Sequence, residues 1–153
     1  MIKASEMIKI ADIHANRINL ALKELQTLFP LDQDKVANFT TQQLLLIELL
    51  VSRFAKLQDF LGKKLINEFF ILEEEPIDDL TMLDKINKLE RLELIESADF
   101  WKEMRDARNH IAHEYPEHPE LTALYLNKIF TLAPKLLHFF NTLKHKINSK
   151  LIS

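Results

Sequence analysis

The sequence predicts an all-α fold: an up-and-down bundle of about five helices, forming a single domain over residues 1–153. Three observations support this. Apolar residues recur at three- and four-residue spacing along nearly the whole chain. The chain contains one glycine, Gly62, which argues against tight hairpins and glycine-rich nucleotide-binding loops. Its 153 residues, 47% of them hydrophobic, suffice for one core.

The first long helix is predicted from an apolar face that ends before Pro30, and residues 31–39 are expected to form a loop. Thr40 and Gln43 form a capping-box pattern that opens a second long helix. Gly62 inside this second helix indicates a close helix crossing, because glycine there costs about 1 kcal/mol relative to alanine. Apolar residues outside the main stripe, including Leu45, predict burial on more than one side.

Three further helices complete the bundle. Asp79 is expected to cap a short third helix, and Ser97 or Asp99 a fourth that continues to Ile111. Pro119 suits the first turn of the last helix. Pro134 lies inside that helix and predicts a kink, because proline removes one backbone hydrogen bond and crowds the preceding turn.

Composition excludes several classes of protein. The chain has no cysteine, so it has no disulfide, no thiol nucleophile and no cysteine-based zinc site. No apolar run is long enough to span a membrane, and the amphipathic N-terminal segment does not resemble a signal peptide. We therefore expect a cytoplasmic protein without a membrane partner. The net charge of −3 gives no overall nucleic-acid signature.

The densest polar cluster is residues 105–115, at the end of the fourth helix. Its Asp106, Asn109, His110 and His113 fall on one broad helical face, so Asp106 or Asn109 could orient an imidazole. Arg108 and His113 would lie about 140° apart on a straight helix. Either the helix loosens before the proline that follows, or a second subunit completes a shared cleft.

This cluster suggests phosphodiester cleavage. Arginine grips a phosphate through two hydrogen bonds, and histidine can transfer a proton near neutral pH. RNA supplies its own 2′-hydroxyl nucleophile, so no metal or cofactor is required. The alternative is a solvated helix end. His110 and His113 have metal-binding spacing but no clearly placed third ligand. His14 is expected to be a hydrogen-bonded core histidine, and the remaining histidines to be solvated: His118, His138 and His145.

Residues 108–115 read Arg, four residues, His, one residue, Tyr. This pattern resembles the motif of HEPN-domain proteins, in particular the HepT toxins that are paired with minimal nucleotidyltransferase (MNT) antitoxins. Residues 83–95, the Phe100–Trp101 pair and Tyr115–Pro116 are also similar to that family. The specific resemblance covers about residues 80–120, and the helical pattern extends it along the chain.

The resemblance implies a helical homodimer with a shared cleft, acting as a metal-independent ribonuclease toxin of a type II toxin–antitoxin system. It implies that Arg108 binds the scissile phosphate, that His113 is the acid/base, and that Asn109 supports the site. Arg105, one turn earlier, is a second candidate phosphate contact. Tyr115 is the candidate for adenylylation by the nucleotidyltransferase antitoxin, which would place negative charge beside the cleft.

Two other hypotheses remain at this point. The chain could be a non-catalytic, substrate-binding partner subunit of a nucleotidyltransferase that presents Tyr115. It could also be a plain helical interaction module, in which Arg108, His113 and Tyr115 tolerate substitution.

Overall fold

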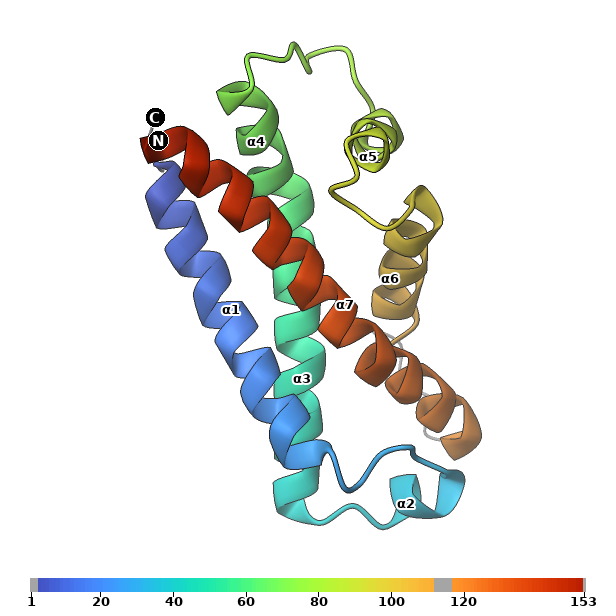
Figure 1. Cartoon of the computed structure of the whole chain (residues 1–153). Coiled ribbons are helices and arrows are strands. Elements are labelled where there is room, and N and C mark those ends of the chain that lie inside the picture. The colour runs from blue at the N-terminus through green and yellow to red at the C-terminus, as the bar shows by residue number, and fades with distance from the viewer. Residues whose placement is uncertain (1–2, 112–116, 153) are drawn as a thin grey trace.

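The computed structural model describes residues 3–111 and 117–152, and it confirms the all-α bundle (Figure 1). Its long helices are α1 (Ala4–Leu25), α3 (Thr41–Phe60) and α7 (Pro119–Ile152). A π-helical segment, Leu61–Leu65, joins α3 to α4 (Ile66–Leu72), so that the backbone stays helical from Thr41 to Leu72. The first turn of α1 and the last turn of α7 lie at the same end of the bundle.

Three shorter helices flank these long ones: α2 (Gln33–Ala37), α5 (Met82–Arg91) and α6 (Ala98–Ile111). The expected loop over residues 31–39 is therefore wrong in part, because it contains α2. The Asp32 side chain caps this helix by accepting a hydrogen bond from the Lys35 backbone N–H at 2.9 Å. Five residues are too few for an apolar periodicity to reveal a helix in the sequence.

Two of the predicted helix caps are confirmed and a third is corrected. Thr40 and Gln43 form the expected capping box at the start of α3. Ser97 caps α6 by accepting from the Phe100 backbone N–H at 3.0 Å. The third helix is capped by Thr81 rather than by Asp79, because Thr81 and Asp84 form a reciprocal capping box.

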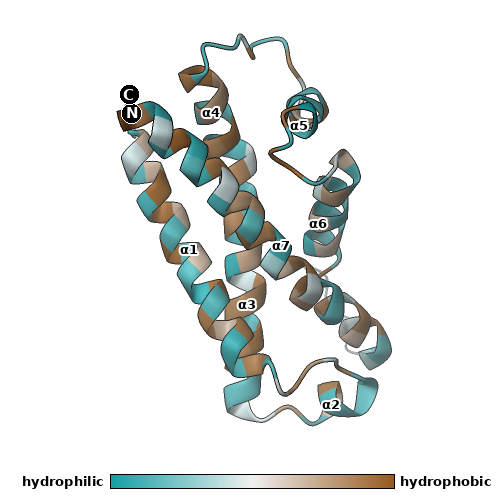
Figure 2. Ribbon diagram, in the orientation of Figure 1, coloured by the Kyte–Doolittle hydropathy of each residue, from teal (hydrophilic) through white to brown (hydrophobic). Residues whose placement is uncertain are grey.

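The core lies where the apolar faces of the helices meet, and each helix alternates hydrophobic and hydrophilic residues around its axis (Figure 2). Phe54, Phe70 and Phe140 are the largest fully buried side chains. The predicted burial of α3 on more than one side is wrong at Leu45, because the exposed fraction of this side chain is 61%. The first turns of α3 lie at one end of the bundle, where fewer helices are available to cover them (Figure 1).

Helix α7 is fixed near its start by the chain that precedes α2. The Asn127 side chain accepts from the Leu31 N–H at 2.7 Å and donates to the Leu31 carbonyl at 2.9 Å. Phe29 stacks on Phe130, with the ring centroids 4.2 Å apart. Pro119 is the first residue of α7, as expected, and the helix continues without interruption through Pro134, where the kink stays a prediction.

Within the described ranges, none of the helices combines the length and apolarity needed to cross a membrane.

Candidate functional site

The polar cluster of residues 105–111 stands on the C-terminal half of α6, which is tied firmly to the core. Phe100, Trp101, Met104 and Ala107 form the buried face of this helix. The opposite face is therefore offered to solvent and to neighbouring helices. Because the buried face fixes the rotation of α6, it also fixes the direction of each polar side chain.

Gly62 sets how closely α6 approaches the π-helical segment. A β-carbon added at Gly62 would lie 3.3 Å from Cζ2 of Trp101, which is closer than ordinary van der Waals contact. The predicted close crossing at Gly62 is therefore confirmed. The π-helical geometry of residues 61–65 was not predicted, and such segments occur frequently at functional sites.

Arg108 is held against α3 rather than left free in solvent. Its Nη2 atom donates to Oδ2 of Asp59 at 2.9 Å, and its Nη1 atom donates to Oδ1 of Asn109 at 3.3 Å. The side chains of Arg108 and Asp59 are 36% and 39% exposed. Arginine has five N–H donors in a planar fork, so this arrangement orients the guanidinium and leaves donors for an anion.

The structure brings Asn109 to Arg108 but directs Arg105 elsewhere. Arg105 is exposed and lines a pocket of about 180 Å³ that also includes Met82 and Ile86 of α5. Its surroundings therefore differ from those of Arg108, which faces α3. Asp106 is exposed and makes no hydrogen bond or ion pair within the described residues. Of the three supporting candidates, Asn109 is the one that the described structure hydrogen-bonds to Arg108.

His110 packs against α7. Its ring stacks on Tyr125 with the centroids 4.5 Å apart and the planes 9° from parallel. The Lys128 ammonium lies 5.6 Å from the centre of the same Tyr125 ring. The sequence did not predict this contact, because two helices separate in the chain must be docked before His110 and Tyr125 meet.

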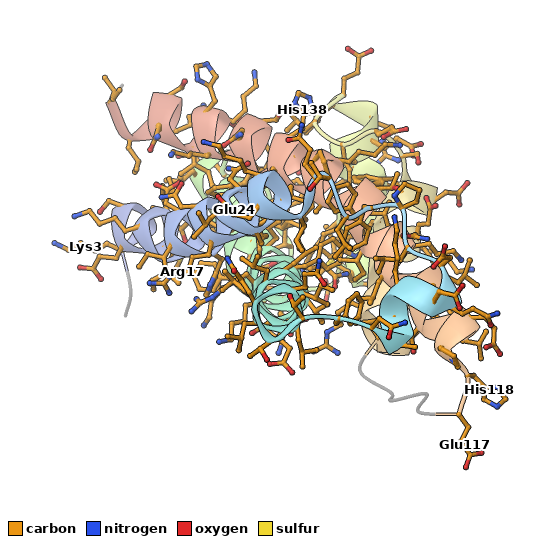
Figure 3. All side chains as sticks on the ribbon, turned by 90° about the horizontal axis from the view of Figure 1, so that it is seen from below. Lys3, Arg17, Glu24, Glu117, His118 and His138 are labelled. Carbon is orange, nitrogen blue, oxygen red and sulfur yellow. The ribbon has the colours of Figure 1, made fainter. Side chains whose placement is uncertain are left out.

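His113 and Tyr115, the other two residues of the motif, lie outside the described residues. Their predicted roles stay predictions. Within the described residues, no group of three histidine, aspartate or glutamate side chains is placed to hold a metal ion. His118, His138 and His145 are exposed, as expected. His118 and Glu117 project into solvent near the start of α7 (Figure 3).

His14 is hydrogen-bonded, as expected, but it lies at a surface groove and is only partly buried. Its Nδ1 atom is 3.0 Å from Nη1 of Arg53. A guanidinium can only donate, so Nδ1 accepts and the imidazole is neutral in this contact. Burial lowers the pKa of His14, and the positive charges of Arg53, Lys56 and Arg17 lower it further.

The groove beside His14 has a volume of about 220 Å³. Its lining residues come from α1, the end of α3 and the π-helical segment: His14, Lys56, Asp59, Phe60, Lys63 and Lys64. Asp59 is shared between this lining and the ion pair with Arg108. The guanidinium of Arg108 is therefore hydrogen-bonded to a residue that lines the groove.

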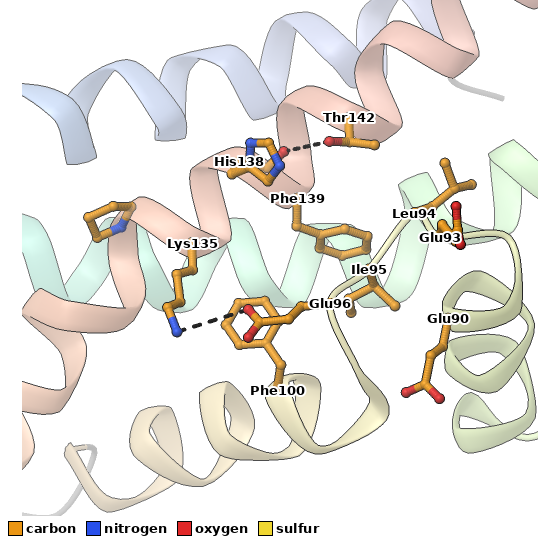
Figure 4. A pocket seen from close by; sticks show the side chains of 11 residues that line it. Glu90, Glu93, Leu94, Ile95, Glu96, Phe100, Lys135, His138, Phe139 and Thr142 are labelled. Atoms are coloured by element: carbon orange, nitrogen blue, oxygen red, sulfur yellow. Dashed lines mark hydrogen bonds and ion pairs between the residues drawn. The ribbon is translucent and has the colours of Figure 1, made fainter.

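A larger cavity of about 620 Å³ lies elsewhere, between α7 and the segment that joins α5 to α6 (Figure 4). Its floor is apolar and includes Phe100 and Phe139. Three glutamates line it, Glu90, Glu93 and Glu96, and the last lies 3.9 Å from Lys135. This acidic surround repels a polyanion, so the larger cavity does not suit the phosphodiester chemistry that Arg108 suits.

Comparison of the chain with protein-family models, with curated proteins and with solved structures found no match.

Proposed function

We propose that the protein is a HEPN-type ribonuclease toxin that cleaves RNA without a metal. The observation that carries the proposal is the state of Arg108. This guanidinium stands at the end of α6, is oriented by Asp59 and Asn109, and keeps donors that bind no group among the described residues. An arginine held in this way suits the binding of a phosphate and the stabilisation of its developing charge.

In the proposed reaction, the RNA 2′-oxygen attacks the adjacent phosphorus and the 5′-oxygen leaves. The products are a 2′,3′-cyclic phosphate and a 5′-hydroxyl. His113 accepts the proton from the 2′-hydroxyl or delivers one to the leaving oxygen. Arg108 binds the phosphate oxygens. A homodimer would supply the two residues to one cleft from different subunits, which removes the 140° mismatch on a single helix.

The test is cleavage of an end-labelled single-stranded RNA by the purified protein in the presence of a chelator. We expect Arg108→Ala to lower the rate by about 10²- to 10³-fold, and His113→Ala by about 10²- to 10⁴-fold. Matched controls are Arg91→Ala on α5 and His118→Ala before α7, which should cleave like the wild type. An RNA with a single deoxy residue at the cut position should resist. Equal cleavage by wild type and His113→Ala would exclude the assigned role.

The proposal includes a nucleotidyltransferase antitoxin as partner. The Tyr115 oxygen would attack the α-phosphorus of ATP and pyrophosphate would leave, with the phenolic proton released to water. The resulting AMP ester places negative charge within the motif that binds RNA, which should suppress cleavage. Incubation with such an enzyme and ATP should increase the mass of the wild type by one AMP unit, and that of Tyr115→Phe not at all.

One observation favours the alternative, a non-catalytic partner subunit of a nucleotidyltransferase. The Asp59 carboxylate offsets the charge of Arg108, so the ion pair could serve a structural role. Under this alternative, purified wild type leaves RNA intact, and Arg108→Ala weakens complex formation with the nucleotidyltransferase. Complex formation measured by light scattering, beside the cleavage assay, separates the two functions. The same measurement on the isolated chain tests the homodimer.

A further inference from the structure

The groove beside His14 is unusual in its concentration of positive charge. Lys56, Lys63 and Lys64 all line it, and each of them is exposed. None of these three ammonium groups forms an ion pair with an acidic side chain of the described residues. The acid in the lining, Asp59, is engaged by Arg108. The groove therefore presents three ammonium groups that have no ion-pair partner among the described residues.

His14 in the groove is affected by burial first and then by nearby positive charges, of which Lys56 is one of the groove lysines. The pKa of His14 is lowered by burial and by the positive charges of Arg53, Lys56 and Arg17. Arg17 lies on α1 and extends the positive surface beyond the groove, on the side of the molecule away from His138 (Figure 3). A neutral His14 that accepts from Arg53 also leaves its Nε2–H as a donor.

An aromatic ring completes the groove. Phe60 is partly buried and lies in the lining beside the lysines, with its ring centroid 6.5 Å from that of His14. Positive side chains that follow a backbone, combined with an aromatic ring on which a base can stack, are the features that bind single-stranded nucleic acid. A small inorganic anion has no base that could stack on this ring.

The π-helical segment explains how the sequence assembles this surface. Lys63 and Lys64 are adjacent residues inside Leu61–Leu65, and both line the groove with Lys56 two turns earlier. The wider turn accommodates an additional residue on one side of the helix. Trp101 packs against Gly62 in the same segment and so fixes α6, with Arg108, beside it.

We propose that this groove binds the single-stranded RNA substrate next to the cut, with its lysines on backbone phosphates and Phe60 stacked on a base. The inference rests on the proposed function, because the strand that binds in the groove is the one cleaved at Arg108. This strand would pass Asp59 on its way into the groove. It adds three phosphate contacts and one base contact to a chain whose net charge alone would not favour RNA.

The test measures binding and cleavage separately. Binding uses a fluorescent single-stranded RNA with 2′-O-methyl riboses, which cannot supply the nucleophile, and is followed by anisotropy from about 0.05 to 0.5 M salt. The variant is Lys56→Gln/Lys63→Gln/Lys64→Gln. The matched control removes three exposed lysines outside the groove, Lys9→Gln/Lys23→Gln/Lys146→Gln, and so has the same net charge.

Each phosphate contact on a single strand contributes about 0.7 to the slope of log affinity against log salt. For the groove variant, the magnitude of this slope should therefore fall by about 2. Its affinity for the RNA should fall about 100-fold at about 0.1 M salt. The control variant should lose much less. Phe60→Leu should weaken binding about tenfold with an unchanged slope, because stacking does not release counterions. Circular dichroism confirms that each variant is folded.

A second readout locates the strand. Phosphates bound in the groove would oppose the cations around His14, so the pKa of His14 measured by NMR should rise when the 2′-O-methyl RNA binds. His138, which lies on α7 and does not line the groove, should respond much less. An equal rise at both histidines would overturn the assigned position.

The outcomes separate the two proposals. If the wild type cleaves RNA, and the groove and control variants bind and cleave alike, the groove is excluded while the ribonuclease stands. If RNA binding depends on the groove lysines but nothing is cleaved, the groove stands and the ribonuclease fails. If the wild type neither binds nor cleaves RNA, both are overturned.

Discussion

The contact between Arg108 and Asp59 makes the most direct prediction, because it joins the motif to a residue 49 positions away in the chain. Asp59→Ala removes the carboxylate that orients the guanidinium. Arg108 keeps its charge, but its side chain can then occupy other rotamers. If Asp59 positions Arg108 for a phosphate, cleavage should fall although Arg108 and the groove lysines are unchanged.

The magnitude follows from the geometry. Both side chains are more than one third exposed, so solvent screens the pair and it should contribute about 0.5 to 1 kcal/mol to stability. The effect on cleavage should be larger, because displacing a catalytic group by about 1 Å can cost about 100-fold in rate. We therefore expect Asp59→Ala to lower the single-turnover cleavage rate up to about 100-fold while lowering the unfolding temperature by only about 1 to 4 °C.

The assay is single-turnover cleavage of labelled RNA, beside thermal unfolding of the same samples. Asp59→Asn keeps an oxygen that can accept from Arg108, and it should recover part of the rate. The matched control is Asp12→Ala, which removes the partner of Lys144 in an ion pair of similar exposure and 2.8 Å length on α1. If Asp59→Ala cleaves at the wild-type rate, or if Asp59→Asn is no better than Asp59→Ala, Asp59 does not position Arg108.

Three further predictions concern the fold. Gly62→Ala should cost about 1 kcal/mol net, because the contact with Trp101 outweighs the gain in helix propensity, and urea unfolding should show no loss in a Trp101→Phe background. Asn127→Ala removes two hydrogen bonds to Leu31 and should cost about 1 to 3 kcal/mol by the same method, with Asn127→Asp intermediate, since it keeps the acceptor. The folded-state pKa of His14 lies below its unfolded value of 6.5, so the unfolded chain binds more protons. Stability should therefore fall as the pH drops below about 6.5, and the wild type should lose more than His14→Gln over that range.

The sequence determined much of the secondary structure, because amphipathic periodicity and capping are local properties. Thr40 with Gln43, Ser97 and Pro119 begin helices as predicted. The same local reasoning failed at Asp79, where the competing box of Thr81 and Asp84 caps the helix. A capping pattern names the types of residue that can cap, but neighbouring candidates compete and the chain that precedes the helix selects among them.

In the candidate site, too, some features could be predicted from the sequence and others depend on the tertiary structure. The sequence by itself singled out Arg108 and Asn109 as neighbours, since their spacing is local, and it marked Gly62 as a position where helices meet. Only the tertiary structure placed Asp59 on Arg108, Tyr125 under His110, and His14 against Arg53. It also turned Arg105 toward α5. These contacts depend on how separate helices dock, and docking is decided by the packing of buried faces such as Trp101 on Gly62, which no local pattern contains.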